Sequence, residues 1–408
     1  SDDDQLIGKT HINPHFKTSY NRTLIWSFNY VGKNFCIKTS VLKKALGSIK
    51  FEGDIIYALL LNIFHDHSNS ILHIPEVLFH YIGSLRHPFD INLNDQKIAL
   101  NNFLSSNNID AKITSGLTSY TQRVRFETTS DKKVSIIIPF KDQATILKKC
   151  VQSIIKHTAY KNYEIILVNH ESSDNKTLAL IKDLEKHEKV QPVLNFEGPF
   201  NYSKINNYAV SQCNGDLILF LNNDTEVLSY GWLQNMIEYI QDKRVAAVGA
   251  KLLYPDGTIQ HAGVIIGIFG VAAHSPKFDK KDNDFYFSRA NTIQNLSACT
   301  AACLLVKKSA FDEVGGFEEQ YLPINFNDID LCLKLRESSY EIIYTPFTEL
   351  YHYESKSRGH AAVNSDDEMI RREIEYFKNR WRKFLEGGDP FYNPNLSLEE
   401  RDYSIKRI

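Results

Sequence analysis

The stretch Leu217-Ile-Leu-Phe-Leu-Asn-Asn-Asp-Thr-Glu226 changes abruptly from apolar residues to amides and carboxylates. A continuous apolar run is typical of a parallel strand that is buried on both faces. Open α/β sheets bind their ligands beyond the carboxyl ends of such strands. The stretch therefore predicts an α/β fold in which Asp224 and Glu226 lie where a metal ion and phosphate groups are bound.

Regular strand and helix patterns surround this stretch. Apolar runs at 134–139, 163–168 and 245–253 predict further strands, and apolar residues recur at helical spacing from Ile146 to Ile155. The order strand, helix, strand is that of a βαβ unit, which places two parallel strands in one sheet. We therefore expect a Rossmann-like, mostly parallel sheet that is flanked by helices.

A second acidic cluster, Asn327-Asp-Ile-Asp330, follows further along the chain. Two functions of this cluster are open. One of its carboxylates can act as a general base beside a metal-assisted transfer site. Alternatively, both acids can cap the helix expected at 331–336 through its N-terminal amides.

Composition limits the classes of protein to consider. The 408 residues exceed what one core usually supports, so two domains or one large domain with an appendage are expected. Lysine and arginine total 47 against 49 acids, which gives no global electrostatic argument for nucleic-acid binding. The six cysteines form no Cys-x-x-Cys pair and are interpreted as reduced thiols of a cytoplasmic protein. Because the chain begins with Ser1, we expect it to be part of a longer polypeptide.

The sequence contains an internal repeat. Asp54-Ile-Ile-Tyr-Ala-Leu-Leu-Leu61 resembles Asp328-Ile-Asp-Leu-Cys-Leu-Lys-Leu335, and the segment 74–80 resembles 344–352, with a histidine at the end of each. Ile56 stands where the second copy has Asp330. The first copy is therefore expected to be a non-catalytic remnant.

Seven motifs follow one another along the chain: Val134-Ser-Ile-Ile-Ile-Pro-Phe-Lys-Asp142, Pro199-Phe-Asn-Tyr-Ser-Lys-Ile-Asn-Asn207, Leu221-Asn-Asn-Asp-Thr-Glu226, Tyr254-Pro-Asp-Gly-Thr-Ile-Gln-His-Ala-Gly263, Gly315-Gly-Phe317, Asn327-Asp-Ile-Asp-Leu-Cys-Leu333 and Asp389-Pro-Phe-Tyr-Asn-Pro-Asn-Leu396. Together they resemble family 2 glycosyltransferases of the GT-A fold, especially bacterial enzymes that build O-antigen, capsule or other surface glycans. The resemblance implies a catalytic GT-A domain at 133–397 and a C-terminal tail at 398–408. It also implies a partial, acceptor-half GT-A-like α/β appendage at 1–88, joined by a linker with one helix at 89–132.

The resemblance implies inverting transfer of a hexosyl or deoxyhexosyl group from a nucleotide-diphosphate sugar to a saccharide or lipid-linked glycan acceptor. Asp328 takes the position of the family's base, and Asp330 is the second catalytic candidate. Residues expected to bind the nucleotide sugar are Pro139, Phe140, Lys141, Asp142, Asn169, Glu171, Asp174, Lys204, Asn207, Asn222, Asn223 and His261.

The resemblance also implies a Mn²⁺ or Mg²⁺ ion held by Asp224 and His352. The family's metal motif commonly reads Asp-x-Asp, whereas this chain has Asn222 at the first position. An amide oxygen still ligates a hard cation, but without charge. A structural function of His352 remains an alternative, because His80 occupies the corresponding place in the first copy.

Two other functions and one question of packing follow from the sequence. The asparagine in the metal motif leaves open a catalytically silent module that binds nucleotide sugars or glycans. A nucleotidyltransferase usually needs a glycine-rich phosphate loop near the first strand, and none is present. The basic amphipathic segment 371–385 either packs on the catalytic domain or makes a peripheral contact at the inner face of the membrane. The chain is also expected to form part of a larger multidomain glycosyltransferase.

Overall fold

A computed structural model describes residues 1–47, 49–50, 52–66, 70–82, 92–128, 131–284, 286–353 and 368–407. The chain forms two compact units. Unit 1 comprises 1–127, 282–295 and 388–408, and unit 2 comprises 128–281 and 296–387. This division differs from the expected domains, since most of the predicted linker and the end of the predicted catalytic domain belong to unit 1. The expected boundary between 88 and 89 lies outside the described residues.

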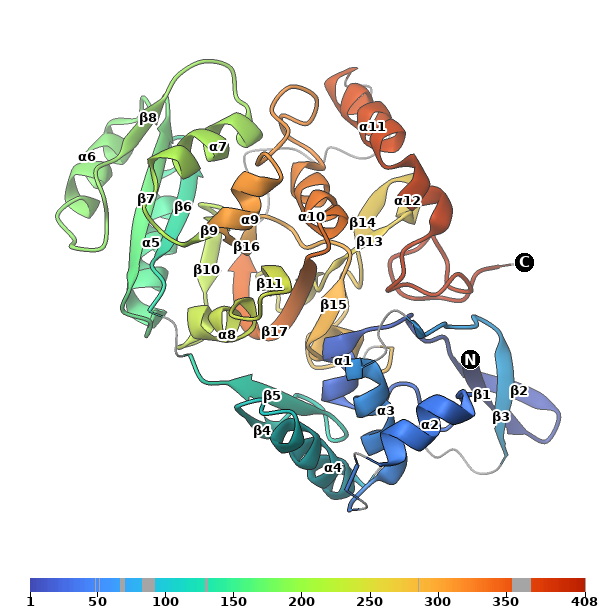
Figure 1. Ribbon diagram of the computed structural model, residues 1–408. Coiled ribbons are helices and arrows are strands. Elements are labelled where there is room, and N and C mark those ends of the chain that lie inside the picture. The colour runs from blue at the N-terminus through green and yellow to red at the C-terminus, as the bar shows by residue number, and fades with distance from the viewer. Residues whose placement is uncertain are drawn as a thin grey trace. The chain divides into compact units, whose positions relative to one another are not determined.

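Unit 2 is built on a long mixed sheet with the strand order β10-β17-β11-β16-β9-β6-β7-β8 (Figure 1). Its strands are β6 (Val134–Phe140), β7 (Tyr163–His170), β8 (Leu194–Phe196), β9 (Leu217–Leu221), β10 (Thr225–Val227), β11 (Val245–Leu253), β16 (Cys303–Lys307) and β17 (Glu341–His352). β6 is parallel to β7 and β9, and β11 is parallel to β17, while β16 runs antiparallel to both of its neighbours. The predicted α/β fold, with parallel strand pairs in a sheet flanked by helices, is confirmed.

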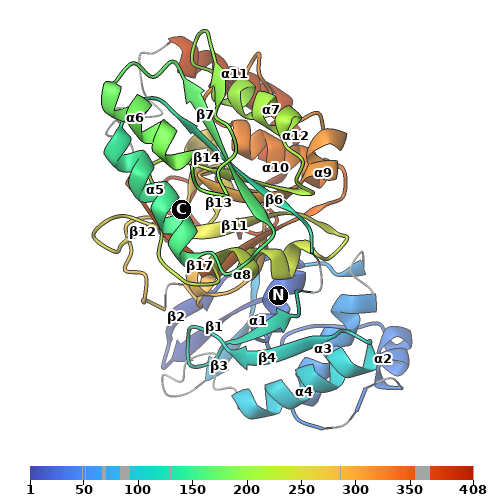
Figure 2. The ribbon, with the colours of Figure 1, turned by 90° about the vertical axis from the view of Figure 1, so that its left-hand side faces the viewer.

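Helices cover both faces of this sheet (Figures 1 and 2). They are α5 (Ala144–His157), α6 (Asn175–Leu184), α7 (Tyr202–Gln212), α8 (Trp232–Ile240), α9 (Lys308–Glu313), α10 (Asn327–Glu337), α11 (Glu368–Arg380) and α12 (Arg382–Gly387). Short elements complete the unit: β12 (Ile259–His261), β13 (Val264–Ile266), the 3₁₀ helix η2 (Ile268–Gly270) and β14 (Ala272–His274). β9 is wholly buried, as its apolar run predicts, so the polar residues that follow it emerge at the sheet edge.

Unit 1 combines a small sheet with helices. The sheet has the order β2-β1-β3 and is formed by β1 (Asp2–Ile7), β2 (Thr10–His15) and β3 (Val77–Ile82). Its helices are α1 (Arg22–Ser27), α2 (Thr39–Leu46), α3 (Ile55–Asp66) and α4 (Leu93–Ser106), and a hairpin joins β4 (Ala111–Ser115) to β5 (Gln122–Phe126). The 3₁₀ helix η3 (Arg289–Asn291) also belongs here, and β15 (Gln294–Leu296) crosses the boundary of the units along the chain.

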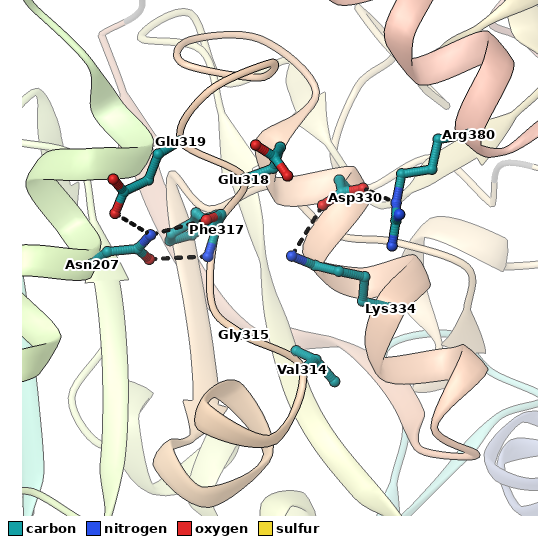
Figure 3. A pocket seen from close by; sticks show the side chains of 9 residues that line it. All are labelled: Asn207, Val314, Gly315, Phe317, Glu318, Glu319, Asp330, Lys334 and Arg380. Atoms are coloured by element: carbon teal, nitrogen blue, oxygen red, sulfur yellow. Dashed lines mark hydrogen bonds and ion pairs between the residues drawn. The ribbon is translucent and has the colours of Figure 1, made fainter.

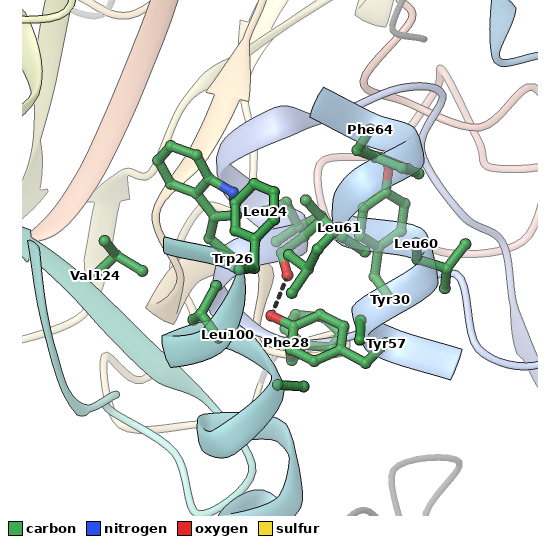
Figure 4. Close-up of a cluster of buried hydrophobic side chains, with 14 of the residues drawn as sticks. Leu24, Trp26, Phe28, Tyr30, Tyr57, Leu60, Leu61, Phe64, Leu100 and Val124 are labelled. Atoms are coloured by element: carbon green, nitrogen blue, oxygen red, sulfur yellow. Dashed lines mark hydrogen bonds between the residues drawn. The ribbon is translucent and has the colours of Figure 1, made fainter. Parts of the chain in front are cut away.

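An aromatic core holds unit 1 together (Figure 4). Leu24, Tyr57 and Leu100 from three helices are at most 1% exposed. The hydroxyl of Tyr57 donates a hydrogen bond to the carbonyl of Ile25 at 2.6 Å, which satisfies a polar group that burial would otherwise destabilise. Unit 1 therefore has a core of its own, as a folded domain requires.

The repeat predicted from the sequence has a structural counterpart. In unit 1, β1 pairs antiparallel with β2 and parallel with β3. In unit 2, β11 pairs antiparallel with β12 and parallel with β17. The helices α3 and α10 precede the last strand of each set, so both copies share strand pairing as well as sequence. None of the described helices is long and apolar enough to span a membrane.

Candidate active site

Two loops beyond the ends of β6 and β7 bring the first group of predicted donor residues together. Phe140 and Asn169 are direct partners in the parallel pairing of these strands. Asp142 Oδ1 accepts hydrogen bonds at 2.9 Å from the backbone N–H groups of Ser173 and Asp174, which ties the loops to each other. Asp142, Gln143 and Glu171 adopt positive φ angles of 51°, 63° and 52°. Such backbone strain in non-glycine residues often marks functional sites.

Several side chains of these loops have local structural partners. Asn169 donates to Asn195 Oδ1 at 2.9 Å and accepts from the Ser172 N–H at 3.1 Å. Asp174 is the N-cap of α6, where it accepts from Thr177 and Lys176, and these bonds hold the pKa of its carboxyl below the ordinary value. Glu171 accepts from the Gly198 N–H, which lowers its pKa. Pro139 lies in β6 and Lys141 directly follows this strand, so both are at the same edge of the sheet. Lys204 lies in α7, and both lysine side chains are exposed.

The proposed metal ligands meet where β10 pairs with the end of β17. Thr225 is the register partner of His352, and His352 Nε2 lies 3.1 Å from Asp224 Oδ1. His352 Nδ1 lies 2.5 Å from Gln260 Oε1, an amide oxygen that only accepts. Nδ1 therefore carries a proton, and in the neutral ring the lone pair is on Nε2. Metal-ligating histidines usually have this arrangement, with the distal N–H held by an oxygen.

The chemistry of this donor set fits a divalent cation. In the neutral ring, Nε2 and Asp224 Oδ1 are two acceptors facing each other, and a cation between them relieves their repulsion. Asn222 adds an amide whose Nδ2 lies 3.3 Å from His352 Nε2. The oxygen of this amide contacts the Tyr202 hydroxyl instead. A carboxylate and an imidazole suit Mn²⁺ better than Mg²⁺, which prefers oxygen ligands alone.

A pocket of about 400 Å³ adjoins Asp224. It is lined by Gln143, Thr145, Ile146, Lys149, Asn223, Asp224, Thr225, Pro255 and Tyr353. Lys149 Nζ lies 2.9 Å from Glu226 Oε2 and 4.4 Å from the centre of the Tyr353 ring. Glu226 is therefore neutralised by Lys149, whereas Asp224 is the carboxylate that faces the His352 ring.

Asp328 lies in the first turn of α10 and faces the segment before β16. Its Oδ2 accepts from the Ala301 N–H at 3.0 Å, and its Oδ1 lies 2.9 Å from the Ile329 N. Burial raises the pKa of this carboxyl, an effect that the Ala301 hydrogen bond opposes. The N-cap position belongs to Phe326, which has no side-chain cap, so Asp328 does not serve as the helix cap.

Hydrogen bonds connect Asp328 with the metal-site pair. The Tyr202 hydroxyl donates to the Ala301 carbonyl at 3.3 Å and contacts Asn222 Oδ1 at 3.5 Å. The Asn222 N–H donates to the Ala302 carbonyl at 3.1 Å. Since Asn222 also contacts His352, the two acidic clusters of the sequence converge on one region of unit 2.

Asp330 points to another part of unit 2, as two residues along a helix are on nearly opposite faces. Its carboxylate lies 3.1 Å from Arg380 Nε and 3.2 Å from Lys334 Nζ (Figure 3). It also accepts a hydrogen bond from Trp381 Nε1 at 3.0 Å. A pocket of about 360 Å³ opens beside these residues. Asp330 therefore attaches α11 to α10, and we do not retain it as a base.

Two other predicted donor residues are engaged inside the protein. Asn207 donates to the Phe317 carbonyl at 2.9 Å and accepts from the Phe317 N–H at 2.9 Å, so it anchors the loop drawn in Figure 3. His261 has no exposed surface and packs against the His274 ring, and burial lowers its pKa well below the ordinary value. The structure thus gives both residues a structural explanation that their sequence pattern did not reveal.

The basic amphipathic segment forms α11 and α12. Phe377 and Trp381 are buried, and the equally buried Glu373 accepts hydrogen bonds from the N–H groups of Ile324 and Asn325. The apolar stripe is therefore used for packing within unit 2, which favours the packing interpretation over membrane contact.

Tyr202, Gln260 and Tyr353 were not predicted as site residues. Each is a neighbour in sequence of a predicted residue or lies inside a quoted motif. Motif membership was thus the available signal, but only the fold shows that Tyr202 and Gln260 contact Asn222 and His352. All six cysteines are free, as expected.

The fold and these motifs define a class of protein. Residues 135–315 match the family model described as Glycosyl transferase family 2. The family assignment therefore applies to this domain, which is less than half of the chain.

Two curated relatives align with nearly the whole chain, and a third aligns with about half of it. An uncharacterized protein of Sinorhizobium fredii, y4gI, is 37% identical over 99% of this chain and 46% of its own length. The O-antigen biosynthesis protein RfbC of Myxococcus xanthus is 32% identical over 100% of this chain and 32% of its own length. The rhamnosyltransferase WbbL of Escherichia coli is 27% identical over 54% of this chain and 83% of its own length. The chain thus spans less than half the length of the first two relatives.

Proposed function

We propose that unit 2 transfers a sugar, with inversion, from a nucleotide-diphosphate donor to a hydroxyl of a glycan acceptor in bacterial surface polysaccharide synthesis. The observation that carries the proposal is the convergence of Asp328 with Asp224 and His352 through Ala301 and Asn222. One carboxylate for the acceptor proton and one cation site for the leaving diphosphate are what a single displacement requires.

Asp328 acts as the general base in this proposal. Its carboxylate removes the proton from the acceptor hydroxyl while the acceptor oxygen forms a bond to the anomeric carbon. The bond from that carbon to the diphosphate oxygen breaks on the opposite face, so the configuration inverts and the nucleoside diphosphate leaves. Partial burial favours proton uptake, since it raises the pKa of the carboxyl, and the Ala301 N–H holds the carboxylate in place.

Asp224 and His352 would hold a divalent cation, which would supply positive charge to the leaving diphosphate. The nucleotide is proposed to bind beyond β6 and β7, where Asp142 fixes the two loops. This edge is where open α/β sheets place their ligands.

The names of the relatives indicate which donors to test. RfbC is an O-antigen biosynthesis protein and WbbL is a rhamnosyltransferase. We therefore propose a deoxyhexose such as rhamnose as the first donor to test, ahead of simple hexoses. The acceptor is proposed to be a lipid-linked or soluble glycan.

The test is Asp328→Asn, which keeps the size of the side chain and removes the base. We expect transfer to fall about 10²–10⁴-fold, the usual contribution of a general base, while calorimetry shows nucleotide-sugar binding unchanged. Asp312→Asn, an exposed acid on α9, is the matched control and should retain full turnover. Full transfer activity in Asp328→Asn would show that Asp328 is not the general base.

Because Asn222 replaces a charged residue of the family's metal motif, one alternative function is a silent module that binds nucleotide sugar without turnover. The same experiment separates the two functions. Donor binding by the unmodified chain, with no transfer and no donor hydrolysis for any sugar in the presence of Mn²⁺, would favour the silent module.

A further inference from the structure

Three potential metal ligands meet in the small sheet of unit 1. Asp4 lies on β1, His11 on β2 and His80 on β3. Asp4 Oδ2 lies 2.8 Å from His11 Nδ1, and Asp4 Oδ1 lies 2.5 Å from His80 Nδ1. Across the described ranges, this is the one group of three such side chains whose ligand atoms all lie within 4.8 Å of one another. It belongs to unit 1, whereas Asp224 and His352 belong to unit 2.

Strand register explains why the three side chains converge. Asp4 is the direct partner of His80, and His11 is the direct partner of Leu6. Since side chains alternate along a strand, Leu6 and Asp4 share a face, so both histidines lie on the face of Asp4. The β1–β2 pairing is irregular between Asp3 and Gln5, beside Asp4. Such irregularities re-aim side chains and are frequent next to functional sites.

The charge of Asp4 is balanced differently from that of its neighbour. Asp3 pairs with the Lys17 ammonium at 2.6 Å, and both side chains are 3% exposed. Asp4 is 7% exposed at its side chain, yet its ring partners are histidines, which carry no charge in their neutral form. A buried carboxylate facing two neutral imidazoles leaves a negative charge that a cation would compensate.

The cluster is also accessible to an ion from solvent. The His11 and His80 side chains are 53% and 39% exposed, so water reaches the two rings on one side while Asp4 closes the other. Two imidazoles and one carboxylate form a three-ligand set that leaves a fourth position to water, as in many zinc sites. Imidazole nitrogen favours Zn²⁺ and similar transition ions over Mg²⁺ or Ca²⁺, which prefer oxygen.

We propose that Asp4, His11 and His80 bind one zinc-type transition-metal ion, which links the three strands of the unit 1 sheet. Each ring binds the metal through Nδ1, and the ring proton resides on Nε2. The ion connects β2 and β3 through β1, so its binding stabilises the sheet. This site is independent of the proposed transfer reaction, because none of its ligands belongs to unit 2.

The experiment uses the whole chain after chelator treatment and dialysis, with Zn²⁺ alone as the probe. Bound zinc is measured by calorimetry and by elemental analysis after gel filtration. We expect His11→Asn and His80→Asn each to bind one zinc fewer than the unmodified chain, or to bind that ion more than about 100-fold more weakly. Even the loss of a hydrogen-bond partner of a metal ligand costs about 10–100-fold. His65→Asn, an exposed histidine on α3 of the same unit, should bind as the unmodified chain does.

Two further measurements separate this site from others. X-ray absorption of the zinc-loaded Asp224→Asn variant should show imidazole nitrogen at about 2.0–2.1 Å from the metal. His80→Asn should keep the transfer activity of the unmodified chain, and circular dichroism should show that it is folded. Equal zinc stoichiometry and affinity in the unmodified chain, His11→Asn and His80→Asn would overturn the proposal.

Discussion

The two units use matching residues of the internal repeat in different ways. Asp54 in unit 1 corresponds in sequence to Asp328 in unit 2. Asp54 Oδ1 accepts from the Tyr57 N–H at 3.0 Å and thus caps α3, whereas Asp328 lies within the first turn of α10 and accepts from Ala301, on another segment. The same residue type is thus a local cap in one copy and a residue of the candidate site in the other. The difference lies in where the helix begins.

The corresponding histidines of the two matching strands differ in the same manner. His80 lies within β3, and His352 is the last residue of β17. His80 faces Asp4 from the neighbouring strand, while His352 faces Asp224 from the loop after β9. A repeat can therefore keep a ligand-bearing strand while the rest of the site comes from elsewhere in the chain.

The largest expected effect is the loss of transfer activity when His352 is replaced, compared with the same replacement of His80. We expect His352→Asn to lower Mn²⁺-dependent transfer at least about 100-fold, because removal of a ligand exceeds the 10–100-fold cost of losing a partner of a ligand. His80→Asn should leave transfer unchanged. Steady-state rates measured against Mn²⁺ concentration check both results. Equal losses in both variants, or none in His352→Asn, would contradict the different functions of the two strands.

A pH profile distinguishes the two aspartates. Burial raises the pKa of Asp328, and a general base works only when deprotonated, so activity should fall as the pH drops through this raised pKa. The rate should decline about tenfold per pH unit below it, at a higher pH than an ordinary aspartate would give. In Asp54→Ala, the decline of kcat/KM at low pH (the acid limb) should occur at the same pH as in the unmodified chain. An acid limb at the ordinary aspartate value would argue against Asp328 as the base.

The sequence predicted the sheet and the acidic clusters but not every side-chain orientation. The buried strands β6, β7, β9 and β11 are continuous apolar runs, and such runs are readable without a structure. Asp330 is different, because its direction depends on where α10 begins and on Arg380 of α11, distant along the chain. The burial of His261 likewise depends on tertiary packing, which no local pattern records. The strands of unit 1 before residue 16 are polar and were not predicted.

Asp330 and Ile56 are a third pair of corresponding residues that differ between the two copies of the repeat. Asp330→Asn removes the charge that faces Arg380 and Lys334, so we expect a loss of roughly 1–3 kcal/mol in the free energy of unfolding. This is less than for a fully enclosed pair, because Arg380 is 38% exposed and can regain water. Chemical denaturation checks the loss, and Asp183→Asn, an exposed acid on α6, should stay within about 0.5 kcal/mol of the unmodified chain. No loss in Asp330→Asn would show that this acid does not hold α11 on α10.

The smallest expected effect tests the capping function of Asp54. Asp54→Ala leaves the Tyr57 N–H without its side-chain acceptor, and loss of an N-cap costs about 1 kcal/mol. Asp54→Asn should be almost neutral, because asparagine caps helices about as well as aspartate. Denaturant unfolding, followed by the fluorescence of the tryptophans, measures both variants. Transfer activity should be unchanged in both variants. A loss of activity in Asp54→Ala without a loss of stability would show that the first copy contributes to catalysis. That outcome would contradict the assignment of Asp54 as a cap and Asp328 as the base.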